Sequence, residues 1–312
     1  MSFYITILGS SAALPTSTRF PTAHALNLHE RFFLIDCGEG TQIQLRKYRV
    51  KFGKINHVFI SHMHGDHVFG IFGLITTFSL LGRKHDLHIY AHNEFKEVID
   101  FYLEKFARDL TYNIIFHVIP AKKDKKIFEN DKLSVLAFPL KHRIPCSGFI
   151  FREKKAEKNI KKEAIEKYKL SIAQVQEVKR GRDHVMGNGN IIPNEELTLP
   201  DYKKRAYAYC TDTKFRPEIK KYLHEVDILY HEATFAEKDK KLANITYHST
   251  AKQAATIAKE ANIGKLLVGH FSSRYKDTSI FEKECREIFP DSYAVNDGDT
   301  FEIPRRRVDG TS

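Results

Sequence analysis

The stretch Ser61-His62-Met63-His64-Gly65-Asp66-His67 gathers three histidines and an aspartate within six residues, directly after the predicted strand His57–Ile60. Imidazole and carboxylate groups are the ligands that zinc takes in proteins. The first two histidines are predicted to point to one side, and the Asp66–His67 pair to face a neighbouring point. Two ligand pairs side by side predict two metal ions. The alternative, four solvated surface residues, accounts poorly for so specific a pattern.

Three further candidate ligands follow other predicted strands. His142 comes after residues 133–138, Asp212 after 207–210 and His270 after 266–269. A single histidine after a strand is more often an ordinary loop residue. However, sites in sheets covered by helices gather beyond the carboxyl ends of strands, and this shared position supports all three residues. Asp212 would suit a bridging position, because a carboxylate has two oxygens.

Strands and helices alternate along both halves of the chain, which predicts a layered α/β domain. The predicted helices are 41–48, 94–106 and 249–261, the last with Thr250 near its start and Gly264 after its end. The predicted strands are 3–8, 25–28, 32–35, 57–60, 87–91, 114–119, 133–138, 206–210, 228–230 and 266–268.

Composition narrows the class of protein. The 312 residues include 50 Lys or Arg and 39 Asp or Glu, a formal net charge of +11, which favours an anionic partner and nucleic acid first. No stretch approaches the roughly 18 consecutive apolar residues of a membrane helix, and no secretory signal is visible. The four cysteines are scattered and form no CxxC pair. We therefore expect free thiols and a cytoplasmic protein without membrane contact.

The amino-acid composition of the chain changes after Phe151. Residues 151–205 hold 14 Lys or Arg against 9 Asp or Glu, few large apolar side chains and the run Gly187-Asn188-Gly189-Asn190. Such a stretch buries little core of its own. We interpret it as an insertion, helical near 161–169 and 173–179, that divides the domain into residues 1–151 and 206–312. A solvated surface excursion is the alternative.

The motif from His62 to His67 resembles the signature of the metallo-β-lactamase superfamily. Within it, the chain resembles ribonuclease Z, the endonuclease that trims the 3′ end of precursor tRNA. The narrower resemblance is carried by Leu14–Thr22, His231-Glu232-Ala233-Thr234-Phe235 and His248-Ser249-Thr250. It extends from about Ile5 to the strand near Phe301. It implies a four-layer αββα metallo-β-lactamase sandwich with a protruding basic insertion, the tRNA-binding arm, at residues 152–205.

The resemblance also assigns roles residue by residue. Two zinc ions per chain are implied, with Asp212 shared between them; Asp66 would in addition hold and deprotonate the attacking water. The leaving ribose 3′-oxygen would take its proton from His248, oriented by Glu232. One ion would be held by His62, His64, His142 and Asp212, the other by Asp66, His67, His270 and Asp212.

Substrate-binding candidates lie in two places. The loop from Pro15 to Pro21 resembles the loop that meets the acceptor end of tRNA, and Arg19 is its candidate for a phosphate or base contact. In the arm the candidates are Lys179, Arg180 and Arg182. Ribonuclease Z enzymes of this length act as homodimers, so the resemblance implies that one subunit's arm holds tRNA for its partner.

The expected activity is therefore a zinc-dependent endoribonuclease that removes the 3′ trailer, leaving a 3′-hydroxyl on the tRNA and a 5′-phosphate on the trailer. One alternative is another hydrolase of this fold, such as a phosphodiesterase, lactonase or thioesterase. The basic insertion and His248-Ser249-Thr250 argue against it. A catalytically inactive RNA-binding protein is the other alternative, and the complete ligand set argues against that.

Overall fold

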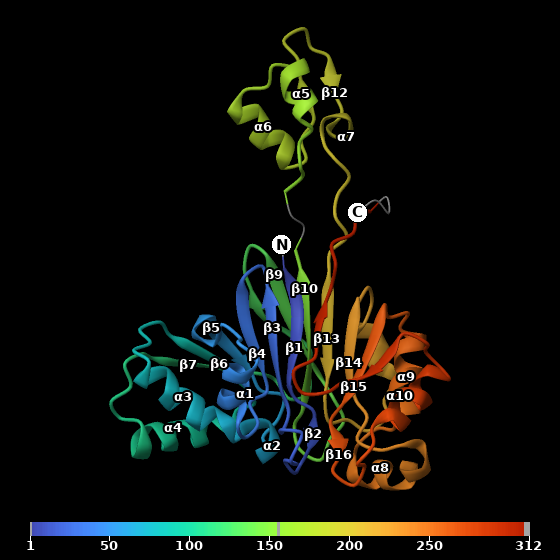
Figure 1. The fold of residues 1–312 in the computed structure, drawn as a ribbon. Helices are drawn as coiled ribbons and strands as arrows, with labels where there is room; N and C mark the ends of the chain where they lie inside the picture. Colours follow the sequence, from blue (N-terminus) through green and yellow to red (C-terminus); the bar gives the residue numbers. More distant parts are fainter. Residues whose placement is uncertain (1, 155–156, 309–312) are drawn as a thin grey trace. The chain divides into compact units, whose positions relative to one another are not determined.

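The structure, a computed structural model, describes residues 2–154 and 157–308. The chain forms two compact units (Figure 1). The first comprises residues up to Arg152 together with Ala206–Ile303, and the second comprises Glu153–Arg205 with the segment from Pro304. The first unit is thus assembled from two stretches of sequence that the second unit separates.

Two seven-stranded sheets form the body of the first unit. In spatial order, the first sheet holds β18 (Thr300–Glu302), β1 (Phe3–Gly9), β3 (Ala23–Leu28), β4 (Arg31–Ile35), β5 (Ile55–Phe59), β6 (Leu87–Ala91) and β7 (Ile114–Val118). The second holds β17 (Ser292–Ala294), β15 (Lys265–Gly269), β14 (Ile228–Glu232), β13 (Ala206–Cys210), β10 (Ser147–Glu153), β9 (Leu133–Pro139) and β8 (Lys125–Glu129).

Each sheet is part antiparallel and part parallel. In the first, β1, β3 and β4 are antiparallel neighbours, whereas β4, β5, β6 and β7 run parallel. In the second, β10 and β13 are antiparallel, whereas β13, β14, β15 and β17 run parallel. Parallel strands end at the same edge of their sheet, so the loops that follow β5, β13 and β15 can bring side chains together there.

The alternation of side chains along the strands explains the layering. Phe3, Ile5 and Ile7 lie on one face of β1 and pack with Tyr207 and Tyr209 of β13 in a core between the two sheets. The outer face of the first sheet is covered by α1 (Thr41–Lys47), α3 (Gly70–Leu80) and α4 (Glu94–Phe106). The outer face of the second is covered by α9 (Ala251–Glu260) and α10 (Ser279–Arg286). The predicted layered α/β sandwich is confirmed.

Short elements complete the first unit. They are β2 (Ser11–Ala12) paired with β16 (Phe271–Ser272), α2 (Gly65–Val68), α8 (Lys240–Thr246), and the 3₁₀ turns Phe52–Lys54, Pro217–Tyr222 and Glu237–Asp239. Thr250, predicted to lie near the start of this helix, is the N-cap of α9, and its hydroxyl and the side chain of Gln253 form a capping box. Among the helices of the described residues, none is long and apolar enough to cross a membrane.

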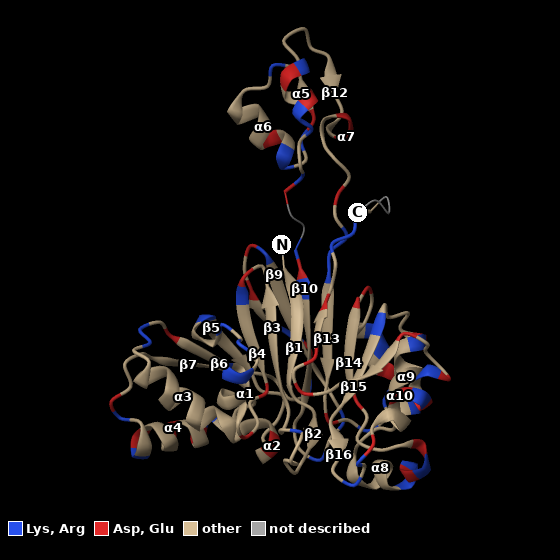
Figure 2. Cartoon of the chain, viewed as in Figure 1, with Lys and Arg blue, Asp and Glu red and all other residues tan. Residues whose placement is uncertain are grey.

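The second unit contains α5 (Lys162–Lys167), α6 (Ile172–Lys179), α7 (Asn194–Leu197) and the paired strands β11 (His184–Val185) and β12 (Ile191–Ile192). Its buried core is small, consisting of Ala164, Val178 and Leu197. Polar bonds add to it: the Asn194 amide donates to the carbonyls of Val178 at 2.7 Å and Arg182 at 2.8 Å. Basic and acidic residues both occur on α5 and α6 (Figure 2).

Candidate metal centre and active site

Seven histidine and aspartate side chains converge where strands of both sheets in the first unit end. Strand β5 is followed by four of them, and β9, β13 and β15 are followed by one each. The structure brings together all seven predicted ligands: His62, His64, Asp66, His67, His142, Asp212 and His270. Their assignment as ligands remains a prediction, but their positions are those that a shared site requires.

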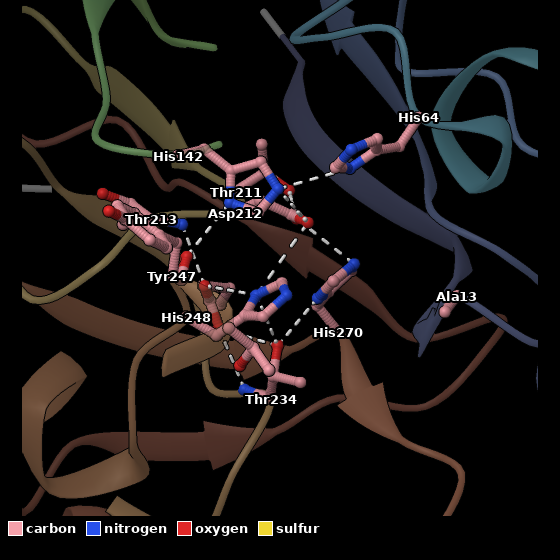
Figure 3. Close-up of polar contacts among 12 residues, drawn as sticks. Ala13, His64, His142, Thr211, Asp212, Thr213, Thr234, Tyr247, His248 and His270 are labelled. Carbon is pink, nitrogen blue, oxygen red and sulfur yellow. Dashed lines mark hydrogen bonds and ion pairs between the residues drawn. The ribbon is translucent and has the colours of Figure 1, made fainter. Parts of the chain in front are cut away.

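The first cluster consists of His62, His64, His142 and Asp212, whose candidate ligand atoms all lie within 4.8 Å of one another. Figure 3 draws three of them, His64, His142 and Asp212. His64 Nδ1 lies 3.0 Å from His62 Nε2 and 3.2 Å from His142 Nε2. Three ring nitrogens that face one point cannot all satisfy each other by hydrogen bonds. A metal ion, by contrast, accepts a lone pair from each of them.

Asp66, His67 and His270 form the second cluster. His67 Nε2 and His270 Nε2 are 3.3 Å apart. Asp66 Oδ2 lies 3.5 Å from the first of these nitrogens and 3.4 Å from the second. The same oxygen accepts a hydrogen bond of 2.8 Å from the backbone N–H of Ala13, which holds the carboxylate in place.

Asp212 lies between the clusters and presents a different oxygen to each. Its Oδ2 is 3.6 Å from His62 Nε2 and 3.7 Å from His142 Nε2. Its Oδ1 is 3.4 Å from His67 Nε2 and 3.2 Å from His270 Nε2. The geometry is that of a carboxylate able to serve two metal ions at once.

The opposite nitrogens of several rings are held by protein groups. His142 Nδ1 donates to the carbonyl of Tyr247 at 3.0 Å, so its Nε2 keeps a free lone pair. His67 Nδ1 is 2.8 Å from the carboxylate of Asp36, and His270 Nδ1 is 2.9 Å from the hydroxyl of Thr234. Such outer contacts orient metal-binding imidazoles.

The electrostatics also fit a cation. Burial alone would raise the pKa of Asp212, but the charges of His270 and His67 bring this pKa well below its ordinary value. The pKa of Asp66 is lowered as well, against its burial, chiefly by His67. Burial places the pKa of His62 well below its ordinary range, so this ring is neutral. Two ionised carboxylates among imidazole nitrogens form a donor set that suits a divalent metal.

His248 and Glu232 form a pair beside the clusters. His248 Nδ1 lies 2.9 Å from Glu232 Oε1 and 3.9 Å from Asp212 Oδ2. Glu232 is fully buried and accepts further hydrogen bonds from the N–H of Thr213 and from the N–H and hydroxyl of Thr234. Burial alone would lower the pKa of His248, but the charge of Glu232 and their hydrogen bond raise it to about 9. The imidazole therefore carries a proton at neutral pH.

Arg19 makes its contacts within the protein. Its guanidinium donates to the Thr278 hydroxyl at 2.8 Å and to Asn296 Oδ1 at 3.2 Å, and it lies over the ring of Phe271 at 5.2 Å. It lines a cavity of about 290 Å³, whereas the cavity at the metal clusters is lined by its neighbours Leu14, Pro15 and Pro21 among others. A contact between Arg19 and substrate stays a prediction, and the structure gives this side chain a role in holding its loop.

The three arm candidates lie in the second unit, at the end of α6 and just after it. Both arginines pair with Glu177: Arg180 at 2.8 Å and Arg182 at 2.5 Å. Arg180 and Arg182 are exposed, and Glu177 and Lys179 are partly exposed. Exposed ion pairs contribute only about 0–1 kcal/mol to stability. Exchanging Glu177 for a phosphate would therefore cost little.

Two residues of the site were missed by sequence reasoning. Asp36, buried after β4, accepts hydrogen bonds from Ser61 and from the Tyr209 hydroxyl at 2.6 Å in addition to facing His67. Thr234 contacts both His248 and His270. The available signal for Asp36 was its place at the carboxyl end of a predicted strand, the same signal that selected Asp212.

Two stacked seven-stranded sheets covered by helices, with a histidine–aspartate centre at the ends of their strands, define a metallo-β-lactamase-fold protein. The metallo-β-lactamase fold protein YhfI of Bacillus subtilis superposes with a TM-score of 0.68 at 17% identity, covering 97% of this chain and all of that one. The short form of human tRNase Z superposes with a TM-score of 0.70 at 26% identity, covering 96% of this chain and 99% of that one.

Curated relatives identify the family. Ribonuclease Z of Bacteroides fragilis is 47% identical over 93% of this chain and 95% of its own, and that of Porphyromonas gingivalis is 41% identical over 95% and 97%. The chain belongs to the ribonuclease Z family. A family model described as anti-Pycsar protein Apyc1 also matches residues 3–160. That match ends before β13 and so leaves out Asp212, Glu232, His248 and His270. The family and the clusters together imply a divalent metal.

Proposed function

We propose that this protein is a zinc-dependent endoribonuclease that removes the 3′ trailer from precursor tRNA, leaving a 3′-hydroxyl on the tRNA and a 5′-phosphate on the trailer. The observation that carries the proposal is the joint presence of a seven-donor centre and the His248–Glu232 pair in a chain of this family. An acid beside a metal centre suits hydrolysis of a phosphodiester whose leaving oxygen needs a proton.

Zinc would be held at two places, by the first cluster and by the second, with Asp212 common to both. Bound there, zinc lowers the pKa of water and offsets charge on the phosphoryl oxygens. Asp66 is ionised and fixed by Ala13, so its carboxylate can orient the attacking water and accept a proton from it. His248 holds the proton that the leaving ribose 3′-oxygen needs, and Glu232 keeps this ring charged and correctly turned.

Mapping the cut tests the proposal. The purified protein is incubated with precursor tRNA labelled at its 5′ end and carrying a 3′ trailer. We expect cleavage after the acceptor stem, a tRNA product with a 3′-hydroxyl, and loss of activity with chelator that zinc restores. If the protein hydrolysed lactones, thioesters or small phosphodiesters but left the precursor tRNA uncut, another hydrolase of this fold would be favoured. If it bound the precursor without cutting it, an inactive RNA-binding protein would be favoured.

Replacing His248 by alanine is expected to slow cleavage of precursor tRNA by about 10²- to 10⁴-fold, the usual contribution of a general acid. The loss should vanish with a substrate whose leaving group is 4-nitrophenolate, because that group departs without a proton. Glu232→Gln, which removes the charge facing His248, should follow the same pattern in smaller measure. The measurement is the single-turnover rate on both substrates, with metal content confirmed as unchanged.

An equal loss on both substrates would contradict the role of His248 as the acid and would point to a role in shaping the centre. Asp109→Ala, which removes an exposed carboxylate of the first unit, serves as the control and should leave both rates unchanged.

We further propose that residues 152–205 are a tRNA-binding arm and that the protein is a homodimer. The excess of Lys and Arg in this stretch supports the arm. Exposed apolar residues at the end of α3 and in the second half of α4, namely Leu80, Leu81, Phe101 and Phe106, support self-association. Light scattering of the purified protein tests the dimer. The four cysteines are free and buried, which supports a cytoplasmic location.

A further inference from the structure

An exposed aromatic ring lies at the cavity that holds the candidate centre. This cavity measures about 640 Å³, and its lining includes Asp66, His248 and Phe69. The side chain of Phe69 is 62% exposed, although it follows the metal motif by only two residues. A single exposed apolar side chain is common on protein surfaces. This one differs because it faces the reacting centre and because the chain makes room for it.

Gly65 provides that room. A Cβ atom at this position would lie 2.3 Å from Phe69 Cε2 and 2.6 Å from Cζ, so any other residue would displace the ring. Gly65 is not among the glycines with positive φ, and therefore its backbone conformation does not demand glycine. The N–H of Phe69 also donates to the carbonyl of Gly65 at 3.0 Å. The ring is thus held against the metal motif with much of its surface open to the cavity.

The position of the ring relates it to the nucleophile rather than to the acid. Asp66 and Phe69 are three residues apart at α2, so their side chains share one face. His248 lies beyond His270, with a separation of 5.5 Å between these two rings, and His270 in turn contacts Asp66. In phosphoryl transfer, the attacking and leaving oxygens lie on opposite sides of the phosphorus. The leaving 3′-oxygen of the tRNA therefore belongs on the side of His248. The trailer stays bonded to the phosphorus through its 5′-oxygen, which is equatorial to the line of attack, so its first base can lie in the part of the cavity that Phe69 lines.

We infer that Phe69 stacks on the base of the first trailer nucleotide and so determines how well the enzyme holds that nucleotide; this inference rests on the proposed ribonuclease function. Aromatic side chains bind single-stranded RNA by stacking, because every base has a π-face. The enzyme would thus grip its departing product next to the cut, by a contact that tolerates different trailer sequences.

A cycle of enzyme and substrate changes tests the inference. Single-turnover kcat/KM is measured on precursor tRNA with an intact trailer and with an abasic first trailer nucleotide. Loss of one stacked base should lower the value for the unmodified protein by about 5- to 150-fold. Phe69→Leu should lose a similar factor on the intact trailer and little more on the abasic one. Phe69→Tyr, which keeps the ring, should retain most of the activity.

Ile43→Ala, which truncates an exposed apolar side chain on α1, is the matched control and should behave as the unmodified protein on both substrates. Metal content must be equal in all variants. The inference would be overturned if the loss of kcat/KM for Phe69→Leu on the abasic trailer equalled the product of the two separate losses. Normal cleavage of the intact trailer by Phe69→Leu would overturn it as well. Coupling to an abasic last nucleotide of the tRNA, rather than the trailer, would overturn it too. Failure of the unmodified protein to cut the precursor would instead remove the ribonuclease function, and this inference with it.

Discussion

Replacing Asp212 by alanine is expected to remove both metal ions and to abolish cleavage of precursor tRNA. Its two oxygens face different clusters, at 3.6 and 3.7 Å on one side and at 3.4 and 3.2 Å on the other. Loss of this side chain also removes the carboxylate of the first cluster and leaves the second with that of Asp66 alone. Metal content per chain, measured by mass spectrometry, and the single-turnover cleavage rate should fall together.

Variants of single-cluster residues sharpen this test. His142→Ala and His270→Ala each remove a donor from one cluster, so each is expected to deplete one metal ion while the other is retained. Asp109→Ala, which removes an exposed carboxylate in the turn after α4, controls for loss of charge and should keep full metal content. One ion per chain in fully active unmodified protein would exclude the two-metal arrangement, and full metal content in Asp212→Ala would exclude the bridging role.

Changing Lys179, Arg180 and Arg182 together to glutamine is expected to weaken binding of precursor tRNA without harming the chemistry. Three lost phosphate contacts should reduce the slope of log affinity against log salt by about 2 to 3, which corresponds to about 100- to 1,000-fold at 0.1 M salt relative to 1 M. Hydrolysis of a small chromogenic phosphodiester should be unchanged, because all seven candidate ligands lie in the first unit. Binding is measured by filter retention over a range of salt concentrations.

A control with the same change in net charge separates the arm from charge in general. Lys122, Lys123 and Lys125, exposed near the start of β8, are changed to glutamine in the matched variant. Equal losses of tRNA affinity in both variants would show that net charge rather than the arm binds tRNA.

Deletion of residues 154–204 provides a second test. Glu153 and Arg205 lie side by side: the N–H of Glu153 donates to the Arg205 carbonyl at 2.9 Å, and their side chains pair at 2.7 Å. A short turn can therefore close the gap. Parental processing by this deletion would make the stretch a surface excursion.

Several helices and the candidate metal ligands can be predicted from local sequence patterns. Helix α4 has the predicted bounds, Glu94–Phe106, because its apolar residues recur at helical spacing on one face. Helix α9 is marked by the capping residues at its start. The metal motif needs only a strand and a turn to bring its side chains together, and both are encoded within a few residues. The ends of the parallel strands β13 and β15 then supply Asp212 and His270, and the end of β9 supplies His142.

Other features depend on contacts that no local pattern contains. No element is predicted over Gly70–Leu80, where apolar residues, two glycines and paired threonines give a mixed signal, yet α3 forms there because it is buried against the first sheet. The role of Asp36 depends on Tyr209, which reaches it from the opposite sheet across 173 positions of sequence. The ring of Phe69 is likewise distinguished only by the cavity that it faces.

The candidate centre lies across the seam between the two sheets. Each cluster takes donors that follow β5 of one sheet and donors that follow strands of the other. A metal ion bound there is a cross-link: it ties residues near position 64 to residues near 142, 212 and 270, and closes long loops that an unfolded chain would leave open. Because such a link exists only in the folded chain, the free energy of metal binding adds to the free energy of folding. The centre that performs the chemistry thus also stabilises the contact between the two sheets. In a cell short of metal, the protein would have a lower free energy of unfolding.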